Sequence, residues 1–179
     1  MMSVPPLFPA IFLDRDGTLM EEVHYCRDPA LVRLFPRVND SLRALQKAGF
    51  KNIIITNQSG IGRGKITLPE YHAVHSRLLE LIGPDLIAAT YFCPDTPAVD
   101  SLRRKPAPGM LLEAARELSI DLARSWFVGD KAIDIQCGHA AGTRAVLVQT
   151  GYGNAQSVAN AEFVTADFAR ATELILAHS

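Results

Sequence analysis

Short apolar runs alternate with segments of helical periodicity along almost the whole of this chain. The apolar runs predict strands at residues 10–13, 52–56, 87–92, 125–128 and 145–148, with a weaker strand at 162–164. The periodic segments predict helices at residues 36–48, 69–82, 109–119, 133–141 and 168–177. Because strands that alternate with helices form β-α-β units, we predict an α/β fold with a Rossmann-like parallel sheet flanked by helices.

The size and composition of the chain restrict its class. A chain of 179 residues fits a single domain spanning residues 1–179. A formal net charge of -1 gives no general reason to bind nucleic acid or a membrane surface. The chain has no apolar run of about eighteen residues that could span a bilayer. We therefore expect a protein that binds neither nucleic acid nor membrane. A monomer is expected, and the sequence leaves the number of subunits open.

The start of the chain and its cysteines indicate the compartment. No positive charge precedes the first apolar residues, and the prolines there disfavour a signal peptide. Cys26, Cys93 and Cys137 are odd in number and widely spaced, which suits reduced, inert thiols. A cytoplasmic location is expected.

Two stretches do not follow the regular alternation. Residues 21–34 follow the first predicted strand, and residues 93–108, with four prolines, follow the third. Open α/β sheets bind their ligands beyond the carboxyl ends of the strands. Both stretches are therefore predicted to be substrate loops.

Two carboxylates follow the first predicted strand. Asp14 and Asp16 are one residue apart, and Gly17 and Thr18 then allow the backbone to turn. On a strand, alternate side chains share a face, so the two aspartates should converge while Arg15 is directed elsewhere. Such oxygen ligands suit Mg²⁺, although an isolated pair could also be an exposed acidic turn.

The end of the second predicted strand carries polar residues before a glycine-rich segment. Thr56, Asn57, Gln58 and Ser59 could present hydroxyl, amide and backbone N–H groups to phosphate oxygens. The spacing is not that of a P-loop. A flexible loop between strand and helix is the structural alternative.

Further charged residues lie before the third main helix and after the fourth strand. Arg104 and Lys105 lie in a proline-restrained segment that could hold a cation in place or could be a solvated basic loop. Asp130 could complete a metal site beside Lys131, or it could cap a helix. Asp134 suits a first-turn electrostatic role.

The motifs D-R-D-G-T, T-N-Q-S-G, R-K-P-x-P-G-M and V-G-D-K-x-x-D occur in this order. Their order resembles the haloacid dehalogenase (HAD) superfamily of phosphohydrolases, from residue 10 to about residue 148. The residues of the T-N-Q-S-G and R-K-P-x-P-G-M motifs are similar to those of the D-glycero-D-manno-heptose 1,7-bisphosphate phosphatases, relatives of histidinol-phosphate phosphatase. The resemblance implies a HAD-like core, and the chain has no insertion large enough to form a cap domain.

This resemblance also implies an activity. It is that of a Mg²⁺-dependent phosphoric monoester hydrolase, which removes the C7 phosphate of D-glycero-β-D-manno-heptose 1,7-bisphosphate. The product is a precursor of the lipopolysaccharide inner core in Gram-negative bacteria. The implied partner is a small phosphorylated sugar.

Catalytic roles follow from the same resemblance. Asp14 matches the nucleophile that forms an aspartyl-phosphate, and Asp16 matches the general acid and base. Mg²⁺ would be held by the Asp14 side chain, the Asp16 backbone carbonyl and Asp130. Thr56 and Lys105 would bind oxygens of the transferring phosphoryl group.

The resemblance further implies a set of substrate contacts. Arg104 matches a residue that recognises the second phosphate, and Arg63 is a weaker candidate. The other residues that match substrate-binding positions are Glu22, Val23, His24, Tyr25, Asn57, Gln58, Ser59 and Lys131.

One departure from the resemblance concerns zinc. Many relatives carry C-x-H-x-P and C-x-C segments that supply four zinc ligands, where this chain has Cys93, Asp95, Ser101 and Arg103. A structural zinc needs a closed set of ligands, usually thiolates and imidazoles. We therefore predict no structural zinc, and we expect the prolines and packing to order the loop.

Two alternative functions remain at this point. The first is hydrolysis of histidinol phosphate or another small sugar phosphate. The second is a phosphoacceptor signalling module, which also places acidic residues, a threonine and a lysine at strand ends. Asp16 favours a hydrolase, because a receiver keeps its acyl-phosphate long-lived. The anomer preference is left open by the sequence, as is the role of Asp134.

Overall fold

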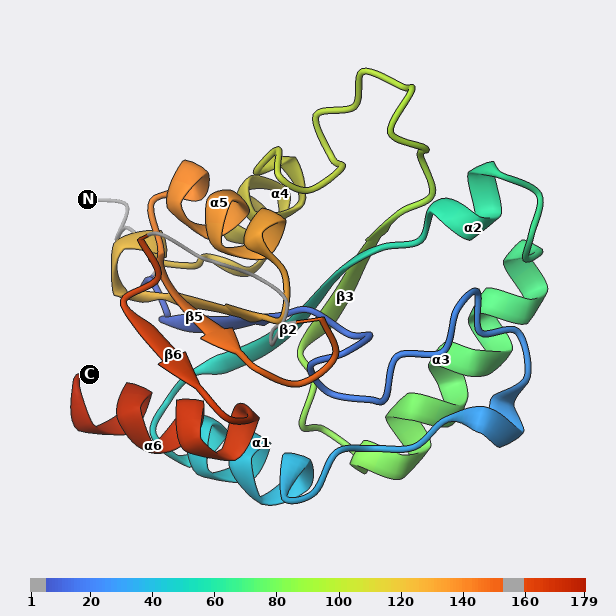
Figure 1. The fold of residues 1–179 in the computed structure, drawn as a ribbon. Helices are drawn as coiled ribbons and strands as arrows, with labels where there is room; N and C mark the ends of the chain where they lie inside the picture. Colours follow the sequence, from blue (N-terminus) through green and yellow to red (C-terminus); the bar gives the residue numbers. More distant parts are fainter. Residues whose placement is uncertain (1–5, 153–159) are drawn as a thin grey trace.

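Six parallel strands form one sheet in the computed structural model, which describes residues 6–152 and 160–179 (Figure 1). The order of the strands in the sheet is β3-β2-β1-β4-β5-β6. Their bounds are β1 Ala10–Leu13, β2 Lys51–Asn57, β3 Ala89–Cys93, β4 Trp126–Gly129, β5 Arg144–Val148 and β6 Phe163–Thr165. The predicted α/β fold is confirmed. The first five residues, used above to argue against a signal peptide, lie outside the described residues.

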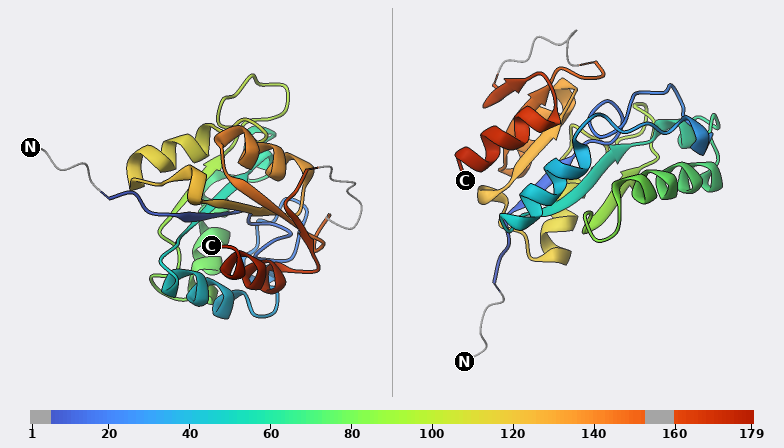
Figure 2. Two further views of the ribbon diagram at one scale, coloured as in Figure 1. Left: turned by 90° about the vertical axis from the view of Figure 1, so that its left-hand side faces the viewer. Right: turned by 90° about the horizontal axis from the view of Figure 1, so that it is seen from below.

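Helices cover both faces of this sheet (Figures 1 and 2). The main helices are α1 Val38–Lys47, α3 Leu68–Ile82, α4 Gly109–Leu118, α5 Ala132–Ala141 and α6 Phe168–Ala177. A short helix α2 spans Ser59–Gly62, and 3-10 turns span Pro29–Leu31 and Leu122–Arg124. Within the described ranges, no helix is both long enough and apolar enough to cross a bilayer.

The apolar residues of β1 divide the core into two halves. Ile11 and Leu13 pack with buried residues of α1, α3 and α6 on one face. Ala10 and Phe12 pack with buried residues of α4 and α5 on the other face. Because both faces of the strand are covered, β1 is a continuous apolar run instead of an alternating one.

The chain reverses its direction of winding between β1 and β4. From β1 it continues through β2 to β3 on one side, and β4, β5 and β6 follow on the other side. Leu13 pairs with Val128, and the Asp14 N–H donates to the Val128 carbonyl at 3.0 Å. The two carboxyl ends at this switch point therefore lie side by side, where open α/β sheets bind ligands.

Some element boundaries differ from those predicted. The helix expected from residue 36 begins at Val38, because Arg37 has a left-handed backbone with φ of 63°. Gly49 follows this helix with φ of 92°, as expected for a glycine after a C-cap. Helix α2 was not predicted, because its four residues, Ser59–Gly62, include two glycines.

Buried Asn52 should stabilise the junction of α1 and β2. Its amide nitrogen donates to the carbonyls of Leu42 and Leu86, each at 3.0 Å, and its side chain is 1% exposed. Asn52→Ala leaves both acceptors unsatisfied, so we expect a loss of about 2–3 kcal/mol in the free energy of unfolding. Urea denaturation followed by circular dichroism measures this loss.

Asn39 provides a matched control. Its amide also donates to two carbonyls, those of Leu81 and Ile82, but it is only partly buried and lies in α1. Water can replace these bonds and alanine favours the helix, so Asn39→Ala should cost less than about 1 kcal/mol. Equal losses for the two variants would contradict the importance of burial.

Candidate active site

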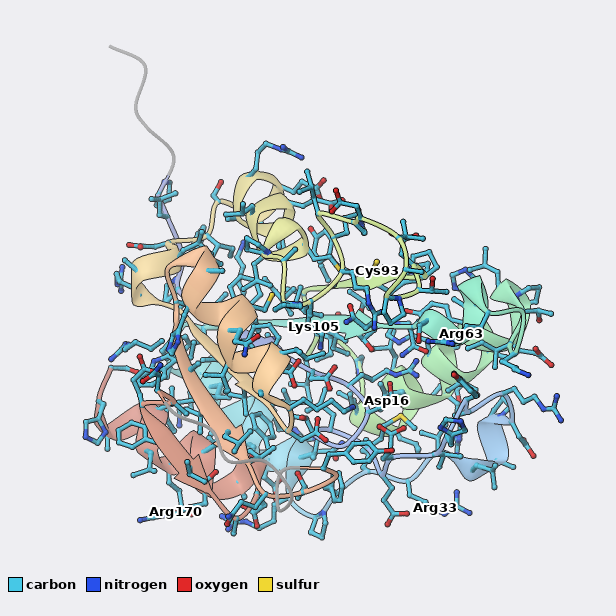
Figure 3. All side chains as sticks on the ribbon, turned by 45° about the horizontal axis from the view of Figure 1, so that its top comes forward. Asp16, Arg33, Arg63, Cys93, Lys105 and Arg170 are labelled. Atoms are coloured by element: carbon cyan, nitrogen blue, oxygen red, sulfur yellow. The ribbon has the colours of Figure 1, made fainter. Side chains whose placement is uncertain are left out.

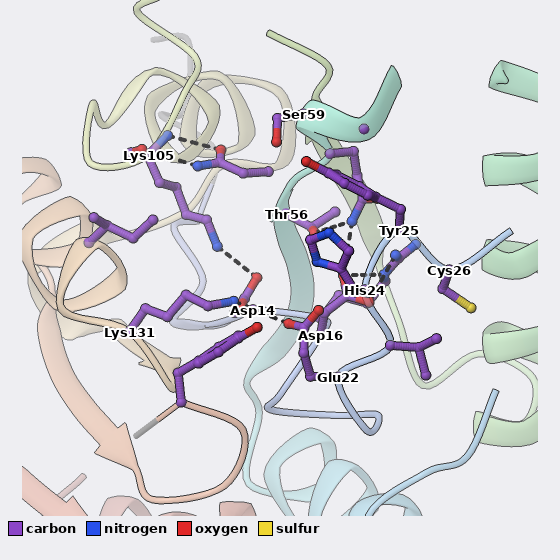
Figure 4. A pocket seen from close by; sticks show the side chains of 17 residues that line it. Asp14, Asp16, Glu22, His24, Tyr25, Cys26, Thr56, Ser59, Lys105 and Lys131 are labelled. Carbon is purple, nitrogen blue, oxygen red and sulfur yellow. Dashed lines mark hydrogen bonds and ion pairs between the residues drawn. The ribbon is translucent and has the colours of Figure 1, made fainter. Parts of the chain in front are cut away.

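A cavity of about 230 Å³ opens at the carboxyl rim of the sheet (Figure 4). Its walls come from the ends of β1 and β2, from the loop at residues 21–34, and from residues around Lys105 and Lys131. The lining residues are Asp14, Arg15, Asp16, Glu22, Val23, His24, Tyr25, Cys26, Thr56, Asn57, Gln58, Ser59, Gly60, Lys105, Lys131, Ile133 and Tyr152.

The backbone turns sharply after β1. The Arg15 carbonyl accepts hydrogen bonds from the N–H groups of Leu19 and Met20 at 3.0 and 3.1 Å. Gly17 has φ of 86°, and a Cβ atom there would collide with the carboxylate of Asp130. A glycine is therefore required at this position both by the backbone conformation and by the close approach of β1 and β4.

Lys105 links two buried carboxylates. Its Nζ lies 2.7 Å from Asp14 Oδ1 and 2.7 Å from Asp134 Oδ1, and it donates to the Ile55 carbonyl at 3.0 Å. Asn57 forms two hydrogen bonds of 3.1 Å with the backbone of Lys105. The Asn57 amide, predicted to contact substrate, thus holds Lys105 against the end of β2.

Three carboxylates lie close together here, and two of them pair with Lys105. One oxygen each from Asp14, Asp130 and Asp134 lies within 4.8 Å of the other two. Asp130 Oδ2 accepts a hydrogen bond from the Tyr152 N–H at 2.8 Å, whereas Oδ1 is buried and has no hydrogen-bond donor in the described part of the chain. Lys131 Nζ is 3.9 Å from Oδ1, which is too far for a hydrogen bond. A buried carboxylate oxygen that lacks a donor suits a hard divalent cation.

Asp134 and Asp130 differ in their local roles. Asp134 Oδ2 accepts from the Lys131 N–H at 3.0 Å, so Asp134 has the first-turn role predicted for it in α5. Lys131, and not Asp130, is the N-cap residue of that helix. The structure does not support Asp130 as a helix cap, and its carboxylate lies in the buried cluster instead.

Burial and charge separate the pKa values of these groups. Burial alone would raise the pKa of Asp14, but the charges of Lys105 and Lys131 outweigh it and hold that pKa below its ordinary value. Burial, with the charge of Asp14 added, raises the pKa of Asp130 to about 8. Burial raises the pKa of Asp134 to about 6 against the opposing charge of Lys105. Asp14 is therefore the carboxylate of this cluster that is most fully ionised.

Arg15 does not point away from the two aspartates, as the strand alternation had suggested. Its guanidinium binds the Asp16 carboxylate through Nε and Nη2, at 2.9 and 3.0 Å. The prediction was wrong because β1 ends at Leu13, so the period of two does not extend through the turn. Gln58 Nε2 donates to Asp16 Oδ2 and to Thr56 Oγ1, both at 2.9 Å.

Residues predicted to contact substrate lie on two sides of the cavity. Lys131 Nζ is 3.3 Å from Glu22 Oε2 and lies 4.9 Å from the centre of the Tyr152 ring. The rings of His24 and Tyr25 are 4.1 Å apart, and Figure 4 shows them across the cavity from Lys131. These side chains present charge and aromatic surface around one space.

The loop at residues 93–108 is held together by its own polar groups. The Cys93 thiol donates to Asp95 Oδ2 at 3.4 Å and lies 3.7 Å from Ser101 Oγ. Ser101 Oγ accepts from the Arg103 N–H, and Arg104 Nη1 donates to the Asp95 carbonyl. Cys93, Asp95, Ser101 and Arg103 occupy the positions of the zinc ligands of many relatives. Hydrogen bonds hold these four residues close together.

Two basic residues proposed for substrate lie outside the cavity lining. The guanidinium of Arg104 is bound within its own loop, at 2.9 Å from the Asp95 carbonyl. Arg63 is exposed at the end of α2, at the edge of the molecule (Figure 3).

Five residues that line the cavity were not predicted to belong to the site: Arg15, Cys26, Gly60, Ile133 and Tyr152. Tyr152 follows β5 by four residues, so the rule that placed ligands beyond strand ends could have identified it. The contact of Arg15 with Asp16 had no signal in the sequence pattern, because it depends on the conformation of the turn.

Comparisons with known proteins find relatives of this chain. A family model described as HAD-hydrolase-like matches residues 102–171. The D-glycero-D-manno-heptose-1,7-bisphosphate 7-phosphatase of Thermosynechococcus vestitus is 38% identical, covering 95% of this chain and 96% of the relative. The D-glycero-beta-D-manno-heptose-1,7-bisphosphate 7-phosphatase of Escherichia coli K12 is 42% identical over 80% of each chain.

A solved structure is similar over nearly its full length. The D,D-heptose 1,7-bisphosphate phosphatase of B. bronchiseptica, complexed with magnesium and phosphate, aligns with a TM-score of 0.87 at 29% identity. The match covers 96% of this chain and 99% of that chain.

The buried carboxylates should make the metal-free protein less stable as the pH rises. The pKa values of Asp130 and Asp134, at about 8 and about 6, lie above the unfolded value of about 3.9. A carboxyl with a raised folded pKa contributes stability below its unfolded pKa and loses it as the pH rises through the folded pKa. From these two carboxyls alone we expect a loss of roughly 5 kcal/mol in the free energy of unfolding between about pH 5 and pH 8.

Urea denaturation in the presence of EDTA measures this loss. Asp130→Asn should flatten the pH dependence, and Mg²⁺ should restore stability most at the higher pH, because it offsets the ionised carboxylates. Stability of the metal-free protein that is constant or rises over this range would contradict the prediction.

Proposed function

The chain is a phosphatase that belongs to the D-glycero-D-manno-heptose-1,7-bisphosphate 7-phosphatases among the HAD-like hydrolases, and we propose that it removes the C7 phosphate of D-glycero-β-D-manno-heptose 1,7-bisphosphate. The observation that carries the chemistry is the pairing of Asp14 with Lys105 inside the cavity. A carboxylate kept ionised beside a fixed cation suits nucleophilic attack on an anionic phosphoryl group.

Asp14 is proposed as the nucleophile. Its carboxylate oxygen attacks phosphorus, the bond from phosphorus to the sugar oxygen breaks, and an aspartyl-phosphate forms. Lys105 and Thr56 would hold phosphoryl oxygens, because both line the cavity with Asp14 and Lys105 donates to Asp14 Oδ1 at 2.7 Å. Their fixed positions would stabilise the charge that develops in the transition state.

Asp16 is proposed as the general acid and base. It lines the cavity with Asp14 and is partly exposed, so it can reach a leaving group (Figure 4). It would protonate the departing sugar oxygen and would then take a proton from the water that hydrolyses the aspartyl-phosphate.

Mg²⁺ is the proposed cofactor. Asp14, Asp130 and the backbone carbonyl of Asp16 would hold it, and the unpartnered oxygen of Asp130 supports this assignment. When bound, the ion supplies positive charge to the phosphoryl group during transfer. The similar B. bronchiseptica enzyme was crystallised with magnesium and phosphate.

The substrate is proposed to bind between the loops at residues 21–34 and 93–108, in one phosphatase domain spanning residues 1–179. Glu22, Val23, His24 and Tyr25 line the cavity from the first of these loops. Arg104, in the second loop, is proposed to turn toward the distal phosphate when the bisphosphate binds. We propose a monomer.

The proposed pathway is the synthesis of heptose precursors for the lipopolysaccharide core. A cytoplasmic location is proposed with it. The thiols of Cys26, Cys93 and Cys137 are all free and buried, which suits a reducing compartment.

Recognition of two phosphates can be tested on Arg104. Arg104→Ala should raise KM for the heptose bisphosphate roughly tenfold or more, because a charge-assisted hydrogen bond contributes about 1.5–3 kcal/mol. It should leave KM for histidinol phosphate unchanged. Mg²⁺-dependent phosphate release over a panel of sugar mono- and bisphosphates, together with histidinol phosphate, gives these values.

Arg103 provides the matched control. Its guanidinium pairs with Glu113 and donates to the Phe92 carbonyl, whereas that of Arg104 donates to the Asp95 carbonyl. Arg103→Ala should leave the preference for the bisphosphate intact. Equal losses on both substrates for Arg104→Ala would count against recognition of a second phosphate.

The chain is also expected to fold without zinc. Cys93 supplies one thiol, and its neighbours Asp95, Ser101 and Arg103 contribute no thiolate or imidazole. Elemental analysis of protein purified without added metal should give far less than one zinc per chain, and a zinc chelator should leave the melting temperature unchanged. A ratio near one zinc per chain would overturn this proposal.

A further inference from the structure

We propose that Arg15 is a positioning residue that fixes the carboxylate of Asp16 and makes Oδ1 the oxygen that transfers the proton. The inference rests on the proposed function, because it needs Asp16 to act as the acid and base. The two residues are adjacent in the chain and both line the cavity.

The contact between Arg15 and Asp16 has the geometry of a fork. Arg15 Nε donates to Asp16 Oδ2 at 2.9 Å, and Nη2 donates to Oδ1 at 3.0 Å. Two parallel hydrogen bonds from a planar guanidinium fix the plane of a carboxylate, which a single ammonium group cannot do. The fork therefore determines where the remaining lone pairs of Asp16 point.

Gln58 makes the two oxygens of this carboxylate unequal. Asp16 Oδ2 accepts from both Arg15 Nε and Gln58 Nε2, each at 2.9 Å. A carboxylate oxygen has two lone pairs, so both positions on Oδ2 are filled. Oδ1 accepts from Arg15 Nη2 and retains one lone pair that can carry a proton.

Burial keeps Arg15 on Asp16. The Arg15 side chain is 2% exposed and its guanidinium carbon lies 5.5 Å from the centre of the Tyr71 ring. A buried cation without a counter-charge is strongly unfavourable. Release of Asp16 would leave Nε and Nη2 of this buried guanidinium without an acceptor, so the fork should persist when Asp16 is protonated as well as when it is ionised.

The fork matters most when the leaving group needs a proton. As Asp14 attacks phosphorus, the bond to the leaving oxygen breaks and its electron pair stays on that oxygen, which takes the proton from Asp16 Oδ1. The resulting Asp16 carboxylate is stabilised by Arg15. In the second step water attacks the phosphorus of the aspartyl-phosphate, and the bond from phosphorus to the Asp14 oxygen breaks. Asp16 Oδ1 takes a proton from this water, which restores the acid.

Single-turnover kinetics with two kinds of ester test this inference. An alkyl phosphate such as the heptose bisphosphate releases a basic alkoxide, whereas p-nitrophenyl phosphate and acetyl phosphate release stable anions that leave without a proton. Arg15→Met should slow phosphoryl transfer from the alkyl ester about 100-fold and from the other two less than about threefold. KM for the alkyl ester should change little.

Two further variants control for folding. Arg15→Lys retains the charge but cannot form the fork, so it should show the same dependence on the leaving group if Arg15→Met is unstable. Arg170 pairs with Glu173 through a hydrogen bond of 2.7 Å on exposed α6, away from the site (Figure 3). Arg170→Met should leave the rates of phosphoryl transfer from all three esters unchanged.

The outcomes separate this inference from the proposed substrate. Equal slowing of all esters by both Arg15 variants, or no slowing of any, would overturn the positioning role. If the wild-type enzyme does not hydrolyse the heptose bisphosphate but hydrolyses another alkyl phosphate, the proposed substrate is wrong. The comparison of leaving groups with that ester then still tests Arg15.

Discussion

The buried ammonium group of Lys105 holds the carboxylates of the site together. It lies 2.7 Å from two carboxylates, that of Asp14 directly after β1 and that of Asp134 in α5, the helix after β4. Burying three acidic side chains together is costly unless positive charge accompanies them. Since Asn57 fixes the Lys105 backbone against β2, this cation also ties the loop at residues 93–108 to the sheet.

The order of the strands explains why these groups meet. β1 and β4 are neighbours at the point where the winding of the sheet reverses, so their carboxyl ends open toward the same space. Gly17 allows the turn after β1 to approach Asp130 so closely that no side chain fits between them. The metal ligands proposed here are therefore brought together by backbone packing that does not depend on the ligand.

The sequence predicted those parts of the site that follow from strand ends and missed those that follow from side-chain conformation. Asp14, Thr56, Lys105 and Asp130 could be placed because a parallel sheet directs all its carboxyl ends to one rim. Arg15 could not, because strand periodicity ends at Leu13 and a turn has no fixed period. Likewise, apolar patterns hold no information about the four-residue helix α2.

The two aspartates that follow β1 have different counter-ions, and this difference can separate their chemistry. Asp14 faces Lys105, whose charge keeps it ionised, as a nucleophile must be. Asp16 faces Arg15, whose fork fixes its orientation and leaves one lone pair on Oδ1 for a proton. Lys105 belongs to a loop that is distant in sequence, whereas Arg15 lies between Asp14 and Asp16 in the chain. The segment Asp14–Arg15–Asp16 therefore contains the proposed nucleophile, the proposed acid and the residue proposed to orient that acid, because the turn after β1 folds the arginine back onto Asp16.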